Sequence, residues 1–379
     1  MNRYLCALLL PIASMTLRVE AAVFQPLGYP PNGGFTSQAS DVSADGTTVI
    51  GASTVPTGHQ LFRWTEAGGM QPLGALIPSP DWGSTTEGVS GDGSVVVGTI
   101  GNAAYRWTSG GGMVGLSGLP GAGGTAALGV SENGSVIVGG MGGLKKEAYR
   151  WTSDTGPVRL GFLKPAHDYS IAAGVSADGS VIAGMSRSAS QREAFRWTAA
   201  GMIGLGDLSG GEYTSVATAI SADGGVIVGW SASSSGEQAF RWTQGTGLIG
   251  LGDLPGLGFQ SKAYDTTADG SVVVGYSING AFIWDAAGRM QSLKKVLTDV
   301  YEIDLSDWYL IEATGISDDG SVIVGTGINP HGHTEAWRFV VPEPATLSLM
   351  GLGLAYVLAR RQPGWGLPHR RREPFIAAG

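Results

Sequence analysis

Cysteine is almost absent from this chain of 379 residues: the one copy, Cys6, lies inside the apolar run from Tyr4 to Leu17. The rest of the chain contains no cysteine, so without that run it cannot form a disulfide. Cys6 also stands near the beginning of the run rather than just after it, which argues against a lipoprotein anchor.

Basic residues are scarce as well, with 23 Lys and Arg against 31 Asp and Glu and a formal net charge of −8. The imbalance is larger in residues 22–342, which hold 16 of the basic and 28 of the acidic residues, because both ends of the chain are rich in arginine. Nucleic acid requires a basic face, so no nucleic-acid partner is expected. The acidity suits an exported soluble protein or the binding of cations.

Known catalytic motifs are missing too. The sequence has no Gly-x-Ser-x-Gly, no His-Glu-x-x-His and no phosphate loop, which are the signatures of nucleophile, zinc and nucleotide sites. His331-Gly332-His333 offers two imidazoles, and a metal site needs a third ligand. We therefore predict no catalytic residues, no metal and no cofactor. Hydrolysis by carboxylates from different repeats stays open.

What the chain has is one phrase repeated seven times between residues 23 and 342: Gly-Val-Ser, an Asp-Gly turn, a valine run and Ala-Phe-Arg-Trp. A period of 41 to 50 residues is typical of a repeat array or a propeller. The turn glycines that mark the copies are Gly46, Gly93, Gly134, Gly179, Gly224, Gly270 and Gly320.

Residues 174–210 show the strands of one copy best. Asp178-Gly179 supplies a tight hairpin turn at positive φ. Gly-Val-Ser and Val-Ile flank it, Phe-Arg-Trp-Thr follows, and Met202-Ile203 begins a fourth strand. Four short strands per copy predict an all-β fold, a seven-bladed β-propeller with four-stranded blades.

The seventh copy stops after Phe339 without its fourth strand. The missing piece stands at the other end, because Phe24 to Gly28 matches Met70 to Gly74. We therefore predict that residues 22–342 form one propeller closed by the N-terminal strand, which leaves no free sheet edge between the first and last blades.

These motifs resemble the HAF-type extracellular repeat. The Ser-x-Asp-Gly-x-Val-x-x-Gly and Ala-Phe-Arg-Trp-Thr elements carry the resemblance over about 320 residues, and the stretch from Leu293 to Ala313 resembles the terminal insertion of such proteins. The resemblance implies a secreted or surface-attached β protein. It implies no catalytic residues.

Both ends of the chain are predicted to be address labels. Residues 1–21 have the basic start, apolar run and cleavage site of a secretory signal peptide. Residues 343–361 follow the pattern of a sorting segment with a hydrophobic helix, and a basic tail occupies residues 362–379. The apolar part, about 22 Å long as a helix, is short for a bilayer of about 30 Å.

The C-terminal pattern resembles the PEP-CTERM sorting signal of Gram-negative bacteria. Its motif residues are Pro342, Glu343, Pro344, Arg360 and Arg361. The resemblance implies processing by an exosortase-type membrane protease, a transient membrane anchor, and release to the cell surface or extracellular matrix of an exopolysaccharide producer. A permanent single-pass anchor is the alternative.

The repeated polar and aromatic residues are predicted to be structural. One carboxylate per Asp-Gly turn is explained by turn geometry and is too few for calcium. The repeated arginine is expected to bind a carboxylate or a backbone carbonyl. The repeated tryptophan is expected to be buried in its strand, and a platform for stacking a sugar is the alternative.

Loops outside the repeat are better candidates for a ligand site, since function often sits on loops over a fixed scaffold. Aromatic rings beside carboxylates can hold a sugar or calcium. The weak candidates in the loops are Asp299, Tyr301, Asp304, Asp307, Trp308, Tyr309 and Trp82.

The sequence thus favours an exported, surface- or matrix-associated repeat protein with a non-enzymatic binding or structural role. Its partner is expected to be an extracellular polysaccharide or a surface protein. The alternative is an extracellular polysaccharide-acting hydrolase or lyase with carboxylates at the propeller mouth.

Overall fold

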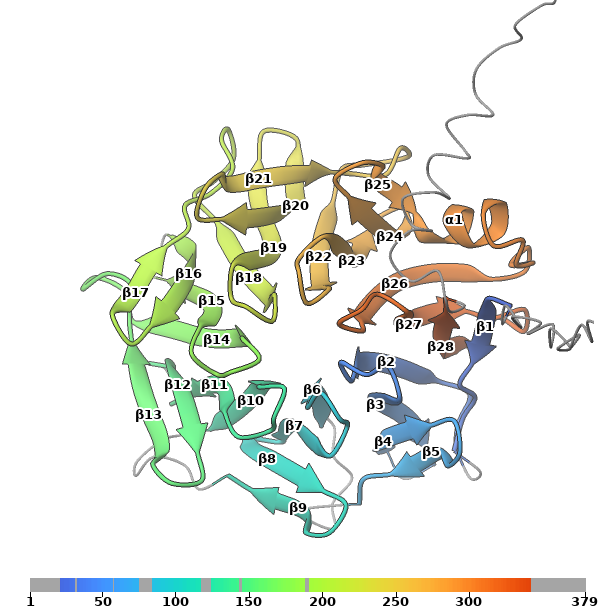
Figure 1. Cartoon of the computed structure of the whole chain (residues 1–379), viewed down its shortest axis with the longest axis horizontal. Coiled ribbons are helices and arrows are strands. Elements are labelled where there is room, and N and C mark those ends of the chain that lie inside the picture. The colour runs from blue at the N-terminus through green and yellow to red at the C-terminus, as the bar shows by residue number, and fades with distance from the viewer. Residues whose placement is uncertain are drawn as a thin grey trace, which may run out of the picture.

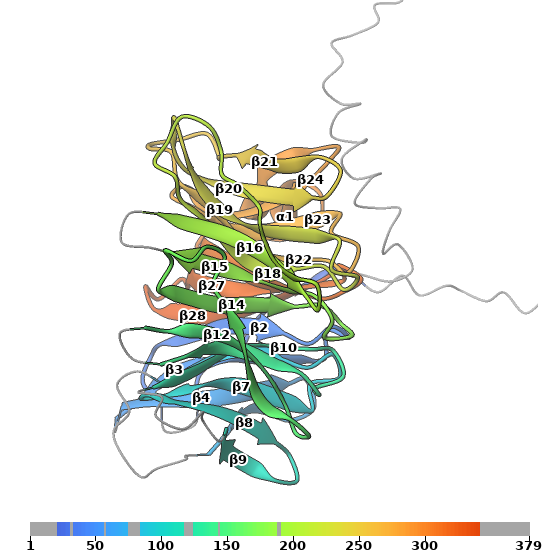
Figure 2. The same cartoon turned by 90° about the vertical axis from the view of Figure 1, so that its left-hand side faces the viewer.

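A computed structural model describes residues 21–341 except 31–32, 57, 75–83, 117–123, 143–144 and 188–190. In this part of the chain lie strands β1 to β28 and the helix α1 (Leu293–Asp299). The predicted all-β class and the four-stranded antiparallel sheets are confirmed. Figure 1 shows the sheets arranged around a central axis, propeller-like, and Figure 2 shows the same arrangement from the side of β13 to β17.

The strands fall into seven four-stranded units, and consecutive strands are neighbours within a unit. Units 1 to 3 are β2 (Ser37–Val42), β3 (Thr48–Val55), β4 (Gly58–Thr65) and β5 (Gly69–Pro72); β6 (Thr85–Val89), β7 (Val95–Ile100), β8 (Ala103–Thr108) and β9 (Gly112–Gly115); β10 (Thr125–Val130), β11 (Ile137–Met141), β12 (Glu147–Thr152) and β13 (Gly156–Gly161). Units 4 and 5 are β14 (Tyr169–Val175), β15 (Ile182–Arg187), β16 (Arg192–Thr198) and β17 (Gly201–Gly204); β18 (Ser215–Ile220), β19 (Val226–Ser233), β20 (Gly236–Thr243) and β21 (Gly247–Gly252).

Units 6 and 7 share one eight-stranded sheet, because the single pair Tyr276 and Glu312 bridges them. Unit 6 is β22 (Ser261–Thr266), β23 (Val272–Ser277), β24 (Gly280–Asp285) and β25 (Arg289–Ser292). Unit 7 is β26 (Tyr309–Ile316), β27 (Val322–Ile328), β28 (Thr334–Val340) and the N-terminal β1 (Val23–Pro26). The first strand of each unit lies innermost in Figure 1.

The Asp-Gly turns have the predicted geometry. In unit 4 the Ser176 hydroxyl donates to the Asp178 carboxylate (2.8 Å), which also accepts the Ser180 N–H (2.9 Å). Gly179 stands at a φ of 73°, and the seven turn glycines span only 67° to 74°. The glycines are required here because other residues adopt this region at a steric cost.

Backbone hydrogen bonds from the turns join each of several units to the next. The N–H of Ala177 donates to the carbonyl of Ala222 (3.0 Å), that of Ala222 to Ala268 (3.0 Å), and that of Ala268 to Asp318 (3.0 Å). The N–H of Asp318 donates in turn to Ala44 (3.1 Å), which places unit 7 against unit 1.

The repeated arginine also bridges units. Its Nε donates to the carbonyl of the next unit's turn glycine, in the pairs Arg63 with Gly93 (3.1 Å), Arg150 with Gly179 (3.3 Å), Arg196 with Gly224 (3.3 Å) and Arg241 with Gly270 (2.9 Å). A carbonyl acceptor explains why unit 3 keeps its arginine although Asn133 replaces its turn aspartate. Of the two partners that the sequence allowed, the backbone carbonyl is the one these four arginines use.

The N-terminal strand completes unit 7, as the sequence predicts. β1 pairs antiparallel with β28, from Val23 opposite Val340 to Pro26 opposite Trp337. Beyond the strand, the N–H of Gly28 donates to the Glu335 carboxylate (3.1 Å). This buried carboxylate therefore anchors the N-terminal segment to the end of the chain.

Apolar side chains fill the spaces between sheets. The phenylalanines of the repeat, Phe62, Phe195, Phe240 and Phe282, are fully buried. The repeated tryptophans are less uniform: Trp64 and Trp242 are buried, and Trp107, Trp151, Trp197 and Trp284 are half-buried. The valine run Val95 to Val97 is buried at every position, as expected of a strand covered on both faces.

Candidate functional site

Two of the predicted loop residues belong to the apolar core. Trp308 is buried, and its ring meets that of Phe24 edge-on with 5.2 Å between centroids. Tyr301 packs in the same manner against Phe339 at 5.1 Å, and burial raises its pKa. Both rings attach the loop after α1 to unit 7, so they have a structural task.

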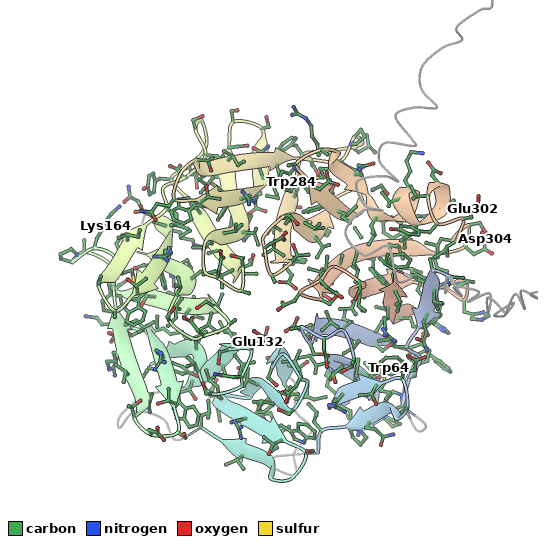
Figure 3. The ribbon with its side chains drawn as sticks, viewed as in Figure 1. Trp64, Glu132, Lys164, Trp284, Glu302 and Asp304 are labelled. Carbon is green, nitrogen blue, oxygen red and sulfur yellow. The ribbon has the colours of Figure 1, made fainter. Side chains whose placement is uncertain are left out.

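The remaining candidates of this loop are on the surface. Asp299 forms an ion pair with Lys295, one helical turn earlier. Asp304 accepts the N–H of Ser306 (3.0 Å), and Asp307 and Tyr309 are exposed. Figure 3 places Asp304 at the outer edge of the molecule, far from the axis. A ligand site on this loop stays a prediction.

Several predicted residues lie outside the described part of the chain. They are Trp82, Pro342, Glu343, Pro344, Arg360 and Arg361. The same holds for residues 1–20 of the predicted signal peptide, for the predicted hydrophobic helix and for the basic tail.

A channel along the central axis brings side chains of all seven units together. The first strand of every unit contains a β-bulge at the same place, where one residue is left unpaired with the second strand. A bulge re-aims a side chain and is common beside functional sites. The bulged residues are Ser40, Glu87, Leu128, Ala173, Thr218, Tyr264 and Thr314, and all seven line one hollow of about 560 Å³.

The bulged residue varies, whereas its neighbours in the chain hardly do. The residue before it is alanine in six units, with Thr86 in unit 2, and the residue after it is glycine or alanine in five units. Asp41 and Asp265 occupy that second position in units 1 and 6. The chemistry of the channel is therefore set by the seven bulged residues and these two aspartates.

The two aspartates stand at a constriction. A smaller hollow of about 140 Å³ on the side of the Asp-Gly turns shares Asp41, Asp265 and several aliphatic residues with the wide one. The shared aliphatic residues are Val89, Val130, Val175 and Ile220. The two hollows thus meet at a mostly apolar ring that contains two carboxyl groups.

Each of these carboxyl groups binds the backbone of two units. Asp41 accepts from Val42 N–H (2.7 Å) through Oδ1 and from Val89 N–H in unit 2 (3.2 Å) through Oδ2. On unit 7, a Cβ added to Gly315 would lie 3.2 Å from Asp41 Oδ1, so the glycine leaves room for the carboxylate.

Asp265 repeats this arrangement on the other side of unit 7. It accepts from Thr266 N–H (2.8 Å) through Oδ1 and from Ile316 N–H in unit 7 (2.9 Å) through Oδ2. All four carboxylate oxygens therefore already have backbone donors. Asp41 therefore helps to join units 1 and 2, and Asp265 helps to join units 6 and 7.

Burial makes the channel carboxyl groups weak acids. It raises the pKa of Asp41 well above its usual range, and the charge of Asp265 adds to the effect. Burial likewise raises the pKa of Asp265 to about 7 and the pKa of Glu87 and Glu312 above their ordinary values. These carboxyl groups therefore keep their protons to higher pH than solvent-exposed carboxyl groups do.

Two of the bulged hydroxyls face a neighbouring unit. Thr218 Oγ1 donates to the carbonyl of Ala263 (2.8 Å) and Thr314 Oγ1 to that of Ala39 (3.1 Å). Burial, followed by the charge of Glu312, raises the pKa of Tyr264. Glu87 and Tyr264 are accordingly the bulged residues with the strongest polar groups for a ligand.

The channel has one sign of charge. Asp41, Glu87, Asp265 and Glu312 line the wide hollow, Glu132 and Asp318 line the narrow one, and within the described residues neither hollow is lined by a Lys or Arg. Figure 3 shows Glu132 at the inner margin of the ring. As these carboxyl groups ionise, the potential inside becomes negative, which favours a cationic or neutral ligand over an anionic one.

The sequence interpretation placed carboxylates at the propeller mouth only as its alternative and named none of these residues. Its signal was present as a variable residue inside the repeated Ala-x-Gly-Val-Ser phrase, and as aspartates in two of the glycine positions. The bulge that turns the variable residue toward the axis depends on strand pairing, which the repeat alone does not reveal.

Residues 340–362 match the PEP-CTERM protein-sorting motif. The motif indicates an exported protein with a membrane-anchored sorting signal, and exosortase, a membrane protein, recognises it. The corresponding sequence prediction is confirmed for this segment. The likeness of the body to HAF-type repeats remains a resemblance.

One similar solved structure supports the fold. The chain is similar to oligogalacturonate lyase from Vibrio parahaemolyticus, a β-propeller, with a TM-score of 0.53 at 10% identity over 86% of this chain and 98% of the lyase. It is also similar to TolB from Acinetobacter baumannii, with a TM-score of 0.43 at 13% identity over 83% of this chain and 65% of TolB, so it spans just under two thirds of that protein. No curated protein matches the sequence.

Two further observations concern membranes and metals. Among the described residues, no helix has the length and apolar character needed to cross a bilayer. In the same part of the chain, His, Cys, Asp and Glu form no group of three that suits a metal ion. His333 of the predicted histidine pair stacks on Phe35 with 4.8 Å between ring centroids.

Proposed function

We propose that this chain is an exported, surface- or matrix-associated binding protein, and that its ligand enters the central channel without being chemically changed. In this proposal the seven units are the blades of a closed propeller, and β1 completes the last blade. The observation that carries the proposal is the single variable residue per unit that the bulges turn into one hollow.

The repeated positions and the variable position have different roles, and this difference supports a binding function. Turn glycines, arginines and phenylalanines recur because they hold the units together, whereas the bulged position takes Ser, Glu, Leu, Ala, Thr or Tyr. A rigid frame with a variable, partly polar lining suits recognition of one ligand.

Charge and size narrow the ligand. About 560 Å³ accommodates part of a polymer or a small molecule. Glu87 and Glu312 disfavour an acidic polymer, so we propose a neutral or amine-bearing group of an extracellular polysaccharide, or a basic side chain of a surface protein. Hydroxyl and amine donors suit carboxylates, which only accept hydrogen bonds when ionised.

A glycan array followed by calorimetry tests the proposal. The native protein should retain neutral or amine-bearing glycans, and Glu87→Gln should weaken retention about tenfold or more because a charge-assisted hydrogen bond is lost. Glu212→Gln, at an exposed position outside the channel, is the matched control. Equal retention by both variants would rule out the channel as the site.

An acid–base enzyme is the second candidate function. The observation in its favour is the coupled pair Asp41 and Asp265, whose pKa values burial raises toward neutrality, as general acids require. The backbone donors on all four oxygens speak against it. Release of reducing ends from the producer's own polymer, abolished by Asp265→Asn, would establish catalysis in place of simple binding.

The address labels complete the proposal. Export should remove about 21 residues, and an exosortase-type protease should cut near the Pro-Glu-Pro sequence, since the arginines behind the apolar segment resist translocation. The intact mass of the protein recovered from the cell surface or medium tests this. A mature species that still carries Arg370 to Arg372 would indicate a permanent anchor instead.

A further inference from the structure

The junction between units 6 and 7 differs from the other six. At the other junctions the turn glycine of one unit packs against a side chain of the previous unit, which stands two residues after that unit's own turn glycine. A Cβ added to Gly224 would lie 2.6 Å from Val181, and a Cβ added to Gly270 would lie 2.4 Å from Val226. A Cβ on Gly320 would meet only Thr267 within 4 Å, at 3.3 Å. The side chain of Val272, which should fill the place, stands farther away.

Unit 6 also lacks the arginine that would reach across. Ile283 stands where the other units have arginine, so the hydrogen bond from the repeated arginine to the next turn glycine has no counterpart at Gly320. A hollow of about 860 Å³ opens on this side and extends across unit 6 to Arg241 and Leu251 of unit 5; Val272, Trp284, Asp285, Arg289, Asp318 and Gly320 are also among its lining residues. We refer to it as the junction hollow.

Two more departures from the repeat face the same hollow. Arg289 adopts a φ of 58° at the position where units 1 to 5 have a glycine. A non-glycine residue there is strained, and such strain is concentrated at ligand sites. Asp285 replaces the threonine that ends the third strand, and its Oδ1 accepts the N–H of Ala287 (2.8 Å). Its other oxygen, Oδ2, carries no hydrogen bond in this turn.

We propose that the junction hollow binds a neutral sugar unit of a glycan. The half-buried indole of Trp284, which Figure 3 shows in unit 6, offers an apolar ring for the C–H face of a sugar. The guanidinium groups of Arg289 and Arg241 can donate hydrogen bonds to a ligand, and the carboxylates of Asp285 and Asp318 can accept them. The hydroxyl groups of a sugar match both kinds of partner, because they donate and accept.

The charges of the lining disfavour an anion. A phosphate or uronate would meet four carboxyl groups, those of Asp269, Asp285, Asp318 and Asp319, against two guanidinium groups. A cation would also meet the two guanidinium groups, whereas a neutral sugar can form hydrogen bonds with groups of both signs. The site is separate from the wide hollow of the channel, so its existence does not depend on the function proposed there.

Calorimetric titration of the full chain with cellotriose, maltotriose and mannotriose tests the site, with a trimer of galacturonic acid and a trimer of glucosamine as charged probes. At least one neutral trimer should bind more tightly than both charged ones. Arg289→Gly restores the glycine of the repeat and should weaken that binding about tenfold while raising Tm by about 1–3 °C through relief of strain. A variant that is more stable but binds the sugar more weakly cannot be explained by a purely structural role of Arg289.

Tryptophan provides a second, matched pair of variants. Binding of a sugar against Trp284 should change the tryptophan fluorescence of the protein. Trp284→Phe should abolish this change and weaken binding about tenfold. Trp242→Phe, at the same repeat position in unit 5 but buried and outside the hollow, should change neither. No binding of any neutral trimer, tighter binding of a charged one, or unaltered binding by both Arg289→Gly and Trp284→Phe would overturn the proposal.

Discussion

Aspartates occur in two regions of this molecule with opposite properties. In the Asp-Gly turns, hydrogen bonds from serine hydroxyls and backbone N–H groups lower the pKa, for example that of Asp178 to about 2 and that of Asp223 below its usual value. In the channel, burial raises the pKa of Asp41 and Asp265. The repeated aspartates stabilise the frame, whereas the fold disfavours the ionised form of the two unrepeated ones.

The difference shows where the repeat has been modified for another purpose. A side chain present in nearly every unit solves a problem that every unit has, here the closing of a hairpin. Asp41 and Asp265 occur where five other units have glycine or alanine, and their ionisation is unfavourable. Positions that break a repeat at a cost in stability are therefore the ones to test for function.

The frame should depend most on the N-terminal strand. Deletion of Val23 to Gly28 exposes the edge of β28 and removes the Gly28 donor from the buried Glu335. We expect a loss of several kcal/mol, since a whole strand and its hydrogen bonds are removed. Thermal and urea unfolding measure the loss. Unchanged melting and solubility would contradict closure of the ring by β1.

A turn glycine should come second. Gly179→Val puts a branched side chain at a φ of 73°, with its Cβ 2.4 Å from Val136 Cγ2 in unit 3. The expected loss of unfolding free energy is roughly 1–3 kcal/mol. Gly245→Val, at an open position without positive φ, is the control and should change little. A stable Gly179→Val protein that had lost only its ligand would show that the turn is a site.

The channel should respond to pH in the opposite sense to the turns. The folded pKa of Asp265 lies near 7 and its unfolded value near 3.8, so the folded state binds more protons between these values and loses stability as pH rises from about 4 to 7. Asp265→Asn lacks this penalty. Relative to the native protein the variant should gain about 2–3 kcal/mol between pH 5 and pH 8. Parallel melting curves at all pH values would refute the raised pKa.

The sequence predicted the frame well and the site poorly, for a physical reason. Asp-Gly and the valine runs are local signals, and the match of Phe24 to Met70 identified β1 as the missing strand. The partner of Arg150 lies 29 residues downstream on another unit, and the meeting of Asp41 with Asp265 requires the ring to bring units 1 and 6 to either side of unit 7. Contacts between units depend on ring geometry, which a period along the chain does not contain.

The exposed loop candidates illustrate the same limit. Aromatic and acidic residues between 299 and 309 looked like a site because they stand outside the repeat. Trp308 and Tyr301 instead join the largest apolar cluster among the described residues. Composition cannot distinguish a ring that binds a ligand from one that attaches a loop, because both need an aromatic face.

The smallest expected effect tests the turn side of the comparison. Asp223→Asn removes a charge but keeps an oxygen that can accept the Ser221 hydroxyl and the Gly225 N–H. Unit 3 already uses this solution, since Asn133 Oδ1 accepts from Ser131 (2.9 Å) and from the Ser135 N–H (3.0 Å). We expect a loss of at most about 0.5 kcal/mol at pH 7, because the group is exposed.

The folded pKa of Asp223 is lowered, so its contribution is complete above the unfolded pKa near 4 and disappears as pH falls through the folded value. The two proteins should therefore unfold together at pH 2, and urea unfolding at pH 7 and pH 2 measures the difference. A deficit that grows in acid would mean that the carboxyl is protonated more easily when folded, which would place the turn aspartates with those of the channel.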